Sequence, residues 1–227
     1  MTTQSNMTFG HRKVRIYETD TDAPIVYSLD FEEDGEALLS ECTALKCPSF
    51  QLVTISQLHW DEELSPWPAP SIVSKDDHFT GEADVLLRVL TEEIVPQAEA
   101  QLKYQPTFRI LSGYSMAGLF ALYAAYRTPL FSHIMSASGS FWFPDFLTFA
   151  ENHAPSPTIQ RAYFSIGDKE SKTRNPYMQK TEANTRRLAT LLQTKGVETC
   201  FELNAGNHFK ETTLRQAKGI HWLLTEK

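Results

Sequence analysis

Residues 107–127 read TFRILSGYSMAGLFALYAAYR, and this stretch decides the fold of the chain. The apolar run at its start is typical of a buried strand. The apolar residues that follow Ser115 recur at three- and four-residue spacing, which indicates a helix. The sequence therefore predicts a strand, a tight turn and a helix, with Ser115 at the turn. Such a turn presents a serine hydroxyl at the tip of a strand, where a nucleophile would lie.

The residues around this serine read G-Y-S-M-A-G. Gly113 has no Cβ and therefore tolerates a sharp, strained turn. The usual nucleophile motif is G-x-S-x-G, so Ala117 occupies the place of the second glycine and Gly118 follows it. The backbone N–H of Met116 lies at the start of the predicted helix, where it can donate to an oxyanion. The alternative interpretation is that Ser115 only caps the helix at an ordinary turn.

Length, charge and cysteine content narrow the class of protein. A chain of 227 residues is long enough for one domain with a substantial core. The net charge of −7 argues against a nucleic-acid-binding surface. No apolar run approaches the roughly 20 residues of a membrane span, and the N-terminus lacks an apolar signal core, so we expect a cytoplasmic protein. Cys42, Cys47 and Cys200 are odd in number and form no C-x-x-C motif, which favours free thiols.

Predicted strands and helices alternate from residue 24 to the end of the chain. Strands are expected at 12–17, 25–29, 50–58, 108–111, 133–137, 162–166 and 198–203. Further helices are expected at 32–45, 81–103, 177–195 and 209–225, and a short helix is expected to start near Asp145 in the aromatic stretch 141–149. Residues 1–10 are polar and are expected to be frayed, and the strand at 25–29 is expected to run antiparallel to that at 12–17. The pattern predicts one α/β domain over residues 1–227, with a mostly parallel sheet, an antiparallel N-terminal edge and helices on both faces.

Three strand ends carry residues that could act together. Ligands of such sheets bind at the carboxyl ends of the strands, and these ends supply Ser115, Glu170 and His208 in the order typical of α/β-hydrolases. A histidine can take the proton of a serine hydroxyl and return it to a leaving group. A carboxylate can hold the imidazole and stabilise its charged form. Asp168, two residues before Glu170, is the alternative acid.

A second oxyanion donor is expected from the chain that follows the strand at 50–58, on the premise that this strand neighbours the one leading to Ser115. The candidate is the backbone N–H of Leu58, although no glycine cluster marks the position.

No cofactor is indicated. No glycine-rich loop could cradle a phosphate, so nucleotide binding has no support. Five potential metal ligands in one segment match no standard ligand spacing, and we therefore expect no metal. They are His59, Asp61, Asp76, Asp77 and His78.

Several longer stretches together resemble one family. They are HWDEELSPWPA at 59–69, LTEEIVPQ at 90–97, GYSMAGLFALYA at 113–124, SASGSFWFPDF at 136–146 and SIGDKESKTRNPYM at 165–178. Through them the chain resembles the "Putative esterase" family of α/β-hydrolases, which includes enterochelin and other siderophore esterases, feruloyl esterases and S-formylglutathione hydrolase. The resemblance implies an α/β-hydrolase fold with Ser115 as nucleophile, His208 as base, Glu170 as acid and Met116 N–H in the oxyanion hole.

The same resemblance implies an aromatic wall for the substrate cleft, formed by Trp60, Trp67 and Trp142, with Tyr114 and His59 as further candidate contacts. The alternative for the tryptophans is that they anchor the loop in which they lie. From the sequence we expect no long lid insertion and no N-terminal β-domain of the kind that full-length enterochelin esterases carry.

The sequence thus predicts a serine esterase that cleaves small-molecule esters of siderophore or short-chain type through an acyl-enzyme, with no cofactor. There are two alternatives. The same serine could transfer the acyl group to another acceptor, or the chain could be a non-catalytic binding module. The sequence is compatible with a homodimer, and we expect neither nucleic acid nor a membrane as a partner.

Overall fold

The stretch that contains Ser115 forms the centre of the molecule in the computed structural model, which describes residues 3–31 and 35–225. Strand β5 (Arg109–Tyr114) is buried over its four middle residues, and helix α5 (Met116–Ala125) is buried over its whole length. A helix that is apolar all round belongs in the interior of a protein. The strand–turn–helix predicted from the sequence is confirmed.

Eight strands form one sheet in the order β1-β2-β4-β3-β5-β6-β7-β8. The remaining strands are β1 (Thr3–Phe9), β2 (Arg12–Glu18), β3 (Ile25–Leu29), β4 (Gln51–Ser56), β6 (His133–Ala137), β7 (Arg161–Gly167) and β8 (Glu198–Asn204). Strands β1, β2 and β4 pair antiparallel, and all pairs from β4 to β8 are parallel. The sheet is therefore mostly parallel with an antiparallel N-terminal edge, as predicted.

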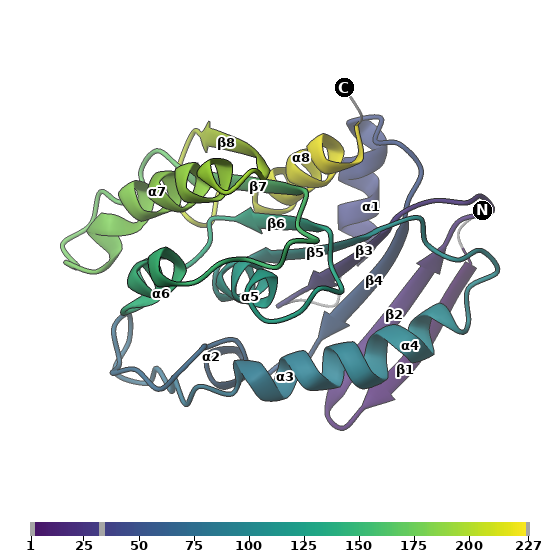
Figure 1. Cartoon of the computed structure of the whole chain (residues 1–227), viewed down its shortest axis with the longest axis horizontal. Coiled ribbons are helices and arrows are strands. Elements are labelled where there is room, and N and C mark those ends of the chain that lie inside the picture. The colour runs from purple at the N-terminus through teal and green to yellow at the C-terminus, as the bar shows by residue number, and fades with distance from the viewer. Residues whose placement is uncertain (1–2, 32–34, 226–227) are drawn as a thin grey trace.

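Helices cover both faces of this sheet (Figure 1). Helices α1 (Gly35–Ala44) and α8 (Thr212–Leu224) pack on each other and share one hydrophobic core. The other face carries a larger core with α5, α3 (Ala83–Val89), α4 (Val95–Glu99), α6 (Phe146–Asn152) and α7 (Thr181–Thr194). The architecture is a single domain of three layers, and the carboxyl ends of its parallel strands lie at one edge.

One prediction about the N-terminal part of the chain is wrong, and the position of a second strand differs from the simplest expectation. Residues 3–9 are not frayed, since they form edge strand β1, in which buried Phe9 and half-buried Met7 alternate with polar residues; residues 1–2 lie outside the described part. Strand β3 runs antiparallel to β2, as predicted, since it is parallel to β4 and β4 is antiparallel to β2, but β3 does not pair with β2. All five residues of β3 are buried, which is typical of a central strand, and it lies parallel between β4 and β5.

The helix predicted over 81–103 is interrupted. A π-helical turn at Leu90–Ile94 joins α3 to α4, and Pro96 follows in the first turn of α4. Proline has no N–H to donate to the preceding turn, so a wider turn at this point is a physically expected adjustment. The connection between β4 and α3 is mostly irregular but contains the short helix α2 (Trp60–Glu63). Within the described ranges, the chain has no helix of sufficient length and hydrophobicity to cross a membrane.

Candidate active site

Ser115 sits in a strained turn between β5 and α5. Its backbone has φ 59° and ψ −123°, a conformation that residues with a side chain rarely adopt. The turn closes so tightly that a Cβ on Gly113 would lie 2.3 Å from the backbone of Ala117. A Cβ on Gly118 would lie 2.8 Å from Ser136 Oγ, so both positions require glycine. Such strain persists only where surrounding structure holds it, and it is frequent at functional sites.

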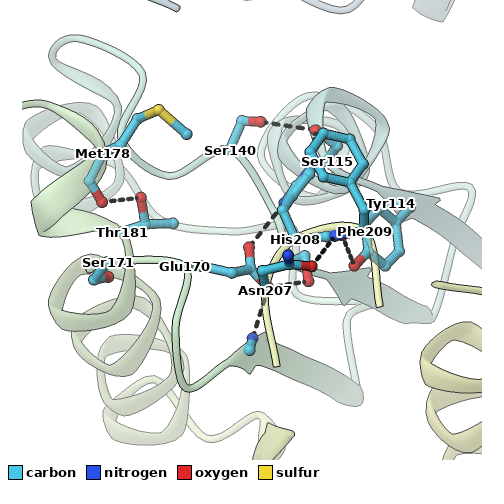
Figure 2. A network of polar contacts seen from close by, with 12 residues as sticks. Tyr114, Ser115, Ser140, Glu170, Ser171, Met178, Thr181, Asn207, His208 and Phe209 are labelled. Carbon is cyan, nitrogen blue, oxygen red and sulfur yellow. Dashed lines mark hydrogen bonds and ion pairs between the residues drawn. The ribbon is translucent and has the colours of Figure 1, made fainter. Parts of the chain in front are cut away.

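Three side chains from three strand ends form a continuous hydrogen-bonded series (Figure 2). Ser115 Oγ lies 3.1 Å from His208 Nε2, and His208 Nδ1 lies 2.8 Å from Glu170 Oε2. Ser115 follows β5, Glu170 follows β7 and His208 follows β8. The structure therefore brings together the three residues that the sequence singled out, with Glu170 rather than Asp168 in contact with the histidine.

The Glu170 carboxylate is held in a dense set of donors, with its side chain only 5% exposed. Its Oε1 accepts hydrogen bonds from the Gly167 N–H (2.6 Å), the Ser138 hydroxyl (2.8 Å) and Arg215 Nη1 (2.9 Å). Burial alone would raise its pKa. The hydrogen bond and charge of His208, with the Gly167 and Ser138 donors, outweigh burial and hold the pKa of Glu170 below its ordinary value. The group is thus kept ionised beside the imidazole.

Asp168 has a different place in the structure. Its Oδ1 accepts a hydrogen bond of 2.7 Å from the backbone N–H of Gly206, in the turn after β8. This bond is the main cause that lowers the pKa of Asp168. Asp168 therefore fastens the turn that leads to His208 without contacting the imidazole.

Arg215 of α8 is a site residue that sequence reasoning missed. Its side chain is 1% exposed, and besides Glu170 its Nη1 contacts the Tyr114 hydroxyl at 3.2 Å. Its Nη2 donates to the carbonyl oxygens of Ala205 (3.4 Å) and Asn207 (3.0 Å). One buried guanidinium thus ties the carboxylate to the turn that carries the histidine. Helical spacing could have indicated that Arg215 is buried, because it lies four residues before buried Gly219 on the inner face of α8.

A cavity of about 480 Å³ opens beside Ser115 and His208. Tyr114 and Trp60, two of the predicted contacts, line it, and so do Phe31 and Phe209, which are 75% and 84% exposed. The remaining walls are Leu29 at the end of β3 and Asp30 after it, Ala37 and Leu38 of α1, and Thr212, Thr213 and Gln216 of α8. Among the residues that the structure describes, no lysine or arginine lines this cavity.

The other predicted substrate contacts lie away from the cavity walls. Trp67 donates its Nε1–H to the Pro144 carbonyl (3.1 Å) and packs within a cluster of aromatic rings. Trp142 is 8% exposed and packs against Phe79. These two tryptophans have the loop-anchoring position that was the alternative interpretation. His59 stacks on His11 with ring centroids 4.0 Å apart.

The premise for Leu58 as an oxyanion donor is wrong. Strand β3, not β4, neighbours β5, so the chain that passes Ser115 is the one after β3. Asp30 and Phe31 lie there and line the cavity, whereas Leu58 packs against the large core. The topology misled the prediction because the sequence does not reveal that β4 is inserted outside β3. Met116 begins α5 directly after Ser115, as predicted.

Within residues 3–31 and 35–225, no three His, Cys, Asp or Glu side chains are arranged to hold a metal ion.

Comparisons with known proteins identify the family and the fold of the chain. Residues 5–214 match the family described as "Putative esterase". The curated "Uncharacterized protein YbbA" of Bacillus subtilis is 26% identical over 91% of this chain and 88% of its own length. An IroE-like serine hydrolase from Shewanella oneidensis superposes with a TM-score of 0.82, at 19% identity over 99% of this chain and 80% of that one. The siderophore hydrolase EstB from Aspergillus nidulans superposes with a TM-score of 0.76, at 18% identity over 98% of this chain and 94% of that one.

The strand order and the strained serine turn define an α/β-hydrolase fold. The chain belongs to the "Putative esterase" family, which makes it a carboxylic ester hydrolase.

Proposed function

We propose that the chain is a serine esterase in which Ser115 is the nucleophile, His208 the general base and Glu170 the acid that orients the histidine. The observation that carries this proposal is the uninterrupted series of two hydrogen bonds from Ser115 Oγ through the imidazole to Glu170. A serine hydroxyl is a weak nucleophile until a base within hydrogen-bond reach removes its proton. His208 Nε2 is at that distance from Ser115.

The reaction proceeds in two halves. Ser115 Oγ bonds to the ester carbonyl carbon while His208 Nε2 takes the hydroxyl proton, and the same proton then passes to the departing alcohol. The result is an acyl-enzyme and a free alcohol. Water then attacks the acyl carbon, His208 takes a proton from the water and returns it to Ser115, and the carboxylic acid leaves. The negative charge of Glu170 stabilises the imidazolium formed in each half.

The negative carbonyl oxygen that forms in each half needs hydrogen-bond donors. The N–H of Met116 at the start of buried α5 is one donor, and it also lies at the positive end of that helix. The N–H of Phe31 is our candidate for the second donor. Its support is that Phe31 follows the strand next to β5 and lines the cavity beside Ser115.

The cavity favours an uncharged ester with an apolar or aromatic group. Aromatic rings of Phe31, Trp60, Tyr114 and Phe209 form much of its lining. With no lysine or arginine in the described lining, and with the Asp30 carboxylate present, an anionic group would gain no paired charge there. Short-chain and aromatic neutral esters are therefore the substrates that we propose first. Siderophore-type esters are the second group, suggested by the structural similarity to a siderophore hydrolase. The cytoplasmic location and the homodimer stay predictions from the sequence.

The test is the hydrolysis of p-nitrophenyl acetate and butyrate by the wild type, Ser115→Ala and His208→Ala. Both variants should lose at least about a thousandfold in kcat, because each removes a group that acts on the reacting atoms. His153→Ala is the matched control, since His153 is exposed, follows the end of α6 and does not line the cavity beside Ser115. Wild-type rates in Ser115→Ala would overturn the proposal. Added alcohols that divert product from acid to a new ester would show acyl transfer instead.

A further inference from the structure

Two cysteines meet where α1 ends. The Cys47 N–H donates to the Cys42 carbonyl at 2.9 Å, and the Lys46 N–H donates to the Thr43 carbonyl at 3.0 Å. Lys46 has a φ of 56°, in the left-handed region. These features define a Schellman motif, the helix ending in which side chains five residues apart come into contact. Here the two positions in contact are Cys42 and Cys47.

The backbone geometry is compatible with a disulfide between them. The 2.9 Å bond from the Cys47 N–H to the Cys42 carbonyl fixes the approach of the two residues. With standard bond lengths, it limits their Cα–Cα separation to about 7 Å, the upper end of the range that disulfides span. Neither cysteine is in a disulfide, and both thiols belong to or pack against the core shared by α1 and α8.

The two thiols have different surroundings. Cys42 is 2% exposed, whereas Cys47 is half-buried, with Sγ 4.0 Å from the Ala217 carbonyl on α8. The hydrogen bond with the Cys42 thiol lowers the pKa of Cys47 to about 7, with the His221 imidazole adding to this effect against the cost of burial. The same hydrogen bond, with burial, raises the pKa of Cys42. Cys47 is therefore the thiol that ionises first and can be reached from solvent.

We propose that Cys42 and Cys47 form a dithiol modification site that a hydroperoxide converts to an intramolecular disulfide. The Cys47 thiolate attacks the O–O bond, which gives Cys47 sulfenic acid and releases an alcohol, or water when the oxidant is hydrogen peroxide. The sulfur of Cys42 then attacks the sulfenic sulfur, forms the S–S bond and releases water. Two thiols and one peroxide thus yield one disulfide, one ROH and one water.

This site is separate from the esterase site. None of Cys42, Cys47 and His221 lines the cavity beside Ser115. Oxidation at the dithiol can therefore be measured without any substrate of the enzyme, and its outcome does not depend on the role of Ser115.

The experiment treats the reduced full-length protein with one equivalent of hydrogen peroxide and then alkylates the remaining thiols. Intact mass should show the loss of two hydrogens and only one alkylated cysteine, Cys200. The chain offers a direct map, because trypsin cleaves after Lys46, between the two cysteines. The disulfide would join two tryptic peptides that separate on reduction.

Variants assign the roles of the two sulfurs. Cys47→Ser should abolish the linked peptide pair, and Cys42→Ser should leave a Cys47 sulfenic acid that dimedone traps. Cys200→Ser is the matched control and should form the linked pair as the wild type does, since Cys200 lies on β8. Recovery of Cys42 and Cys47 both alkylated after peroxide treatment, or a disulfide that involves Cys200 or a second molecule, would overturn the proposal. The tryptic peptides of the oxidised wild-type protein test the proposal even if a variant fails to fold.

Discussion

Replacing Glu170 with glutamine should remove most of the activity, because it reverses the hydrogen bond to His208. Three donors converge on Glu170 Oε1: the Gly167 N–H, the Ser138 hydroxyl and Arg215. In Glu170→Gln, the amide oxygen must face these donors, so the NH₂ group faces His208 Nδ1. That nitrogen then has to accept a hydrogen bond, and the ring proton moves to Nε2. A histidine with its proton on Nε2 cannot take the Ser115 proton.

The size of the loss follows from charge as well as tautomer. The carboxylate and imidazole are joined at 2.8 Å, and their side chains are 5% and 25% exposed. Two charges roughly 4 Å apart at an effective dielectric constant of about 20 interact by roughly 4 kcal/mol. Removing that stabilisation from the transition state corresponds to about a thousandfold in kcat, and the tautomer effect acts in the same direction.

The assay is steady-state hydrolysis of p-nitrophenyl butyrate by Glu170→Gln and Asp168→Asn, with thermal unfolding to confirm that both variants fold. We expect Glu170→Gln to lose about a thousandfold in kcat with little change in KM. Asp168→Asn should lose only a few fold, because Asp168 contacts Gly206 and not the histidine. A kcat for Glu170→Gln within tenfold of wild type, or an equal loss in Asp168→Asn, would refute this reasoning.

Three further predictions concern residues around this centre. In Arg215→Lys, one ammonium cannot reach both Glu170 and the turn carbonyls. The variant should therefore lower kcat more than it raises KM, and its free energy of unfolding in urea titrations should fall by about 2 kcal/mol. Unchanged kcat and stability would contradict this prediction. Trp60→Ala should raise KM for aromatic esters about tenfold with little loss of stability, because Trp60 lines the cavity. Trp67→Ala should lower the free energy of unfolding by about 3 kcal/mol with KM unchanged, because Trp67 packs among aromatic rings. A raised KM in Trp67→Ala and a stability loss in Trp60→Ala would contradict these two assignments. The pKa of Glu170 is lower in the folded chain than its ordinary value of 4.5, so its stabilisation is present above that pH and is lost as pH falls through the lowered value. As the pH is lowered into the acid range, the free energy of unfolding should therefore fall more steeply in the wild type than in Glu170→Gln. The same dependence on pH in both proteins would contradict this linkage.

The sequence allowed the centre of the fold and the three site residues to be predicted for a physical reason. Parallel strands end at one edge, so residues that directly follow such strands come together whatever their separation in the chain. Ser115, Glu170 and His208 obey this rule. Sheet order is less accessible, because strands β3 and β4 both read as buried runs and either could neighbour β5. The error for Leu58 arose from that ambiguity.

Side chains whose role depends on three-dimensional packing were also beyond the sequence. An arginine on a helix is usually exposed, and only the structure shows Arg215 enclosed by acceptors from two turns. Trp60 and Trp67 lie seven residues apart in one segment, yet one lines the cavity and the other anchors the loop. Periodicity cannot separate them, because helix α2 ends at Glu63 and irregular chain leads from there to Trp67.

The most direct test of Ser115 as an activated nucleophile is labelling with a fluorophosphonate, which requires no knowledge of the natural ester. Trypsin releases residues 110–127 as one peptide, in which Ser112 and Ser115 are the only serines. We predict a single adduct on Ser115, absent in Ser115→Ala and formed much more slowly in His208→Ala. A folded wild-type protein that takes up no label, or an adduct on another serine that persists in Ser115→Ala, would contradict the proposed mechanism.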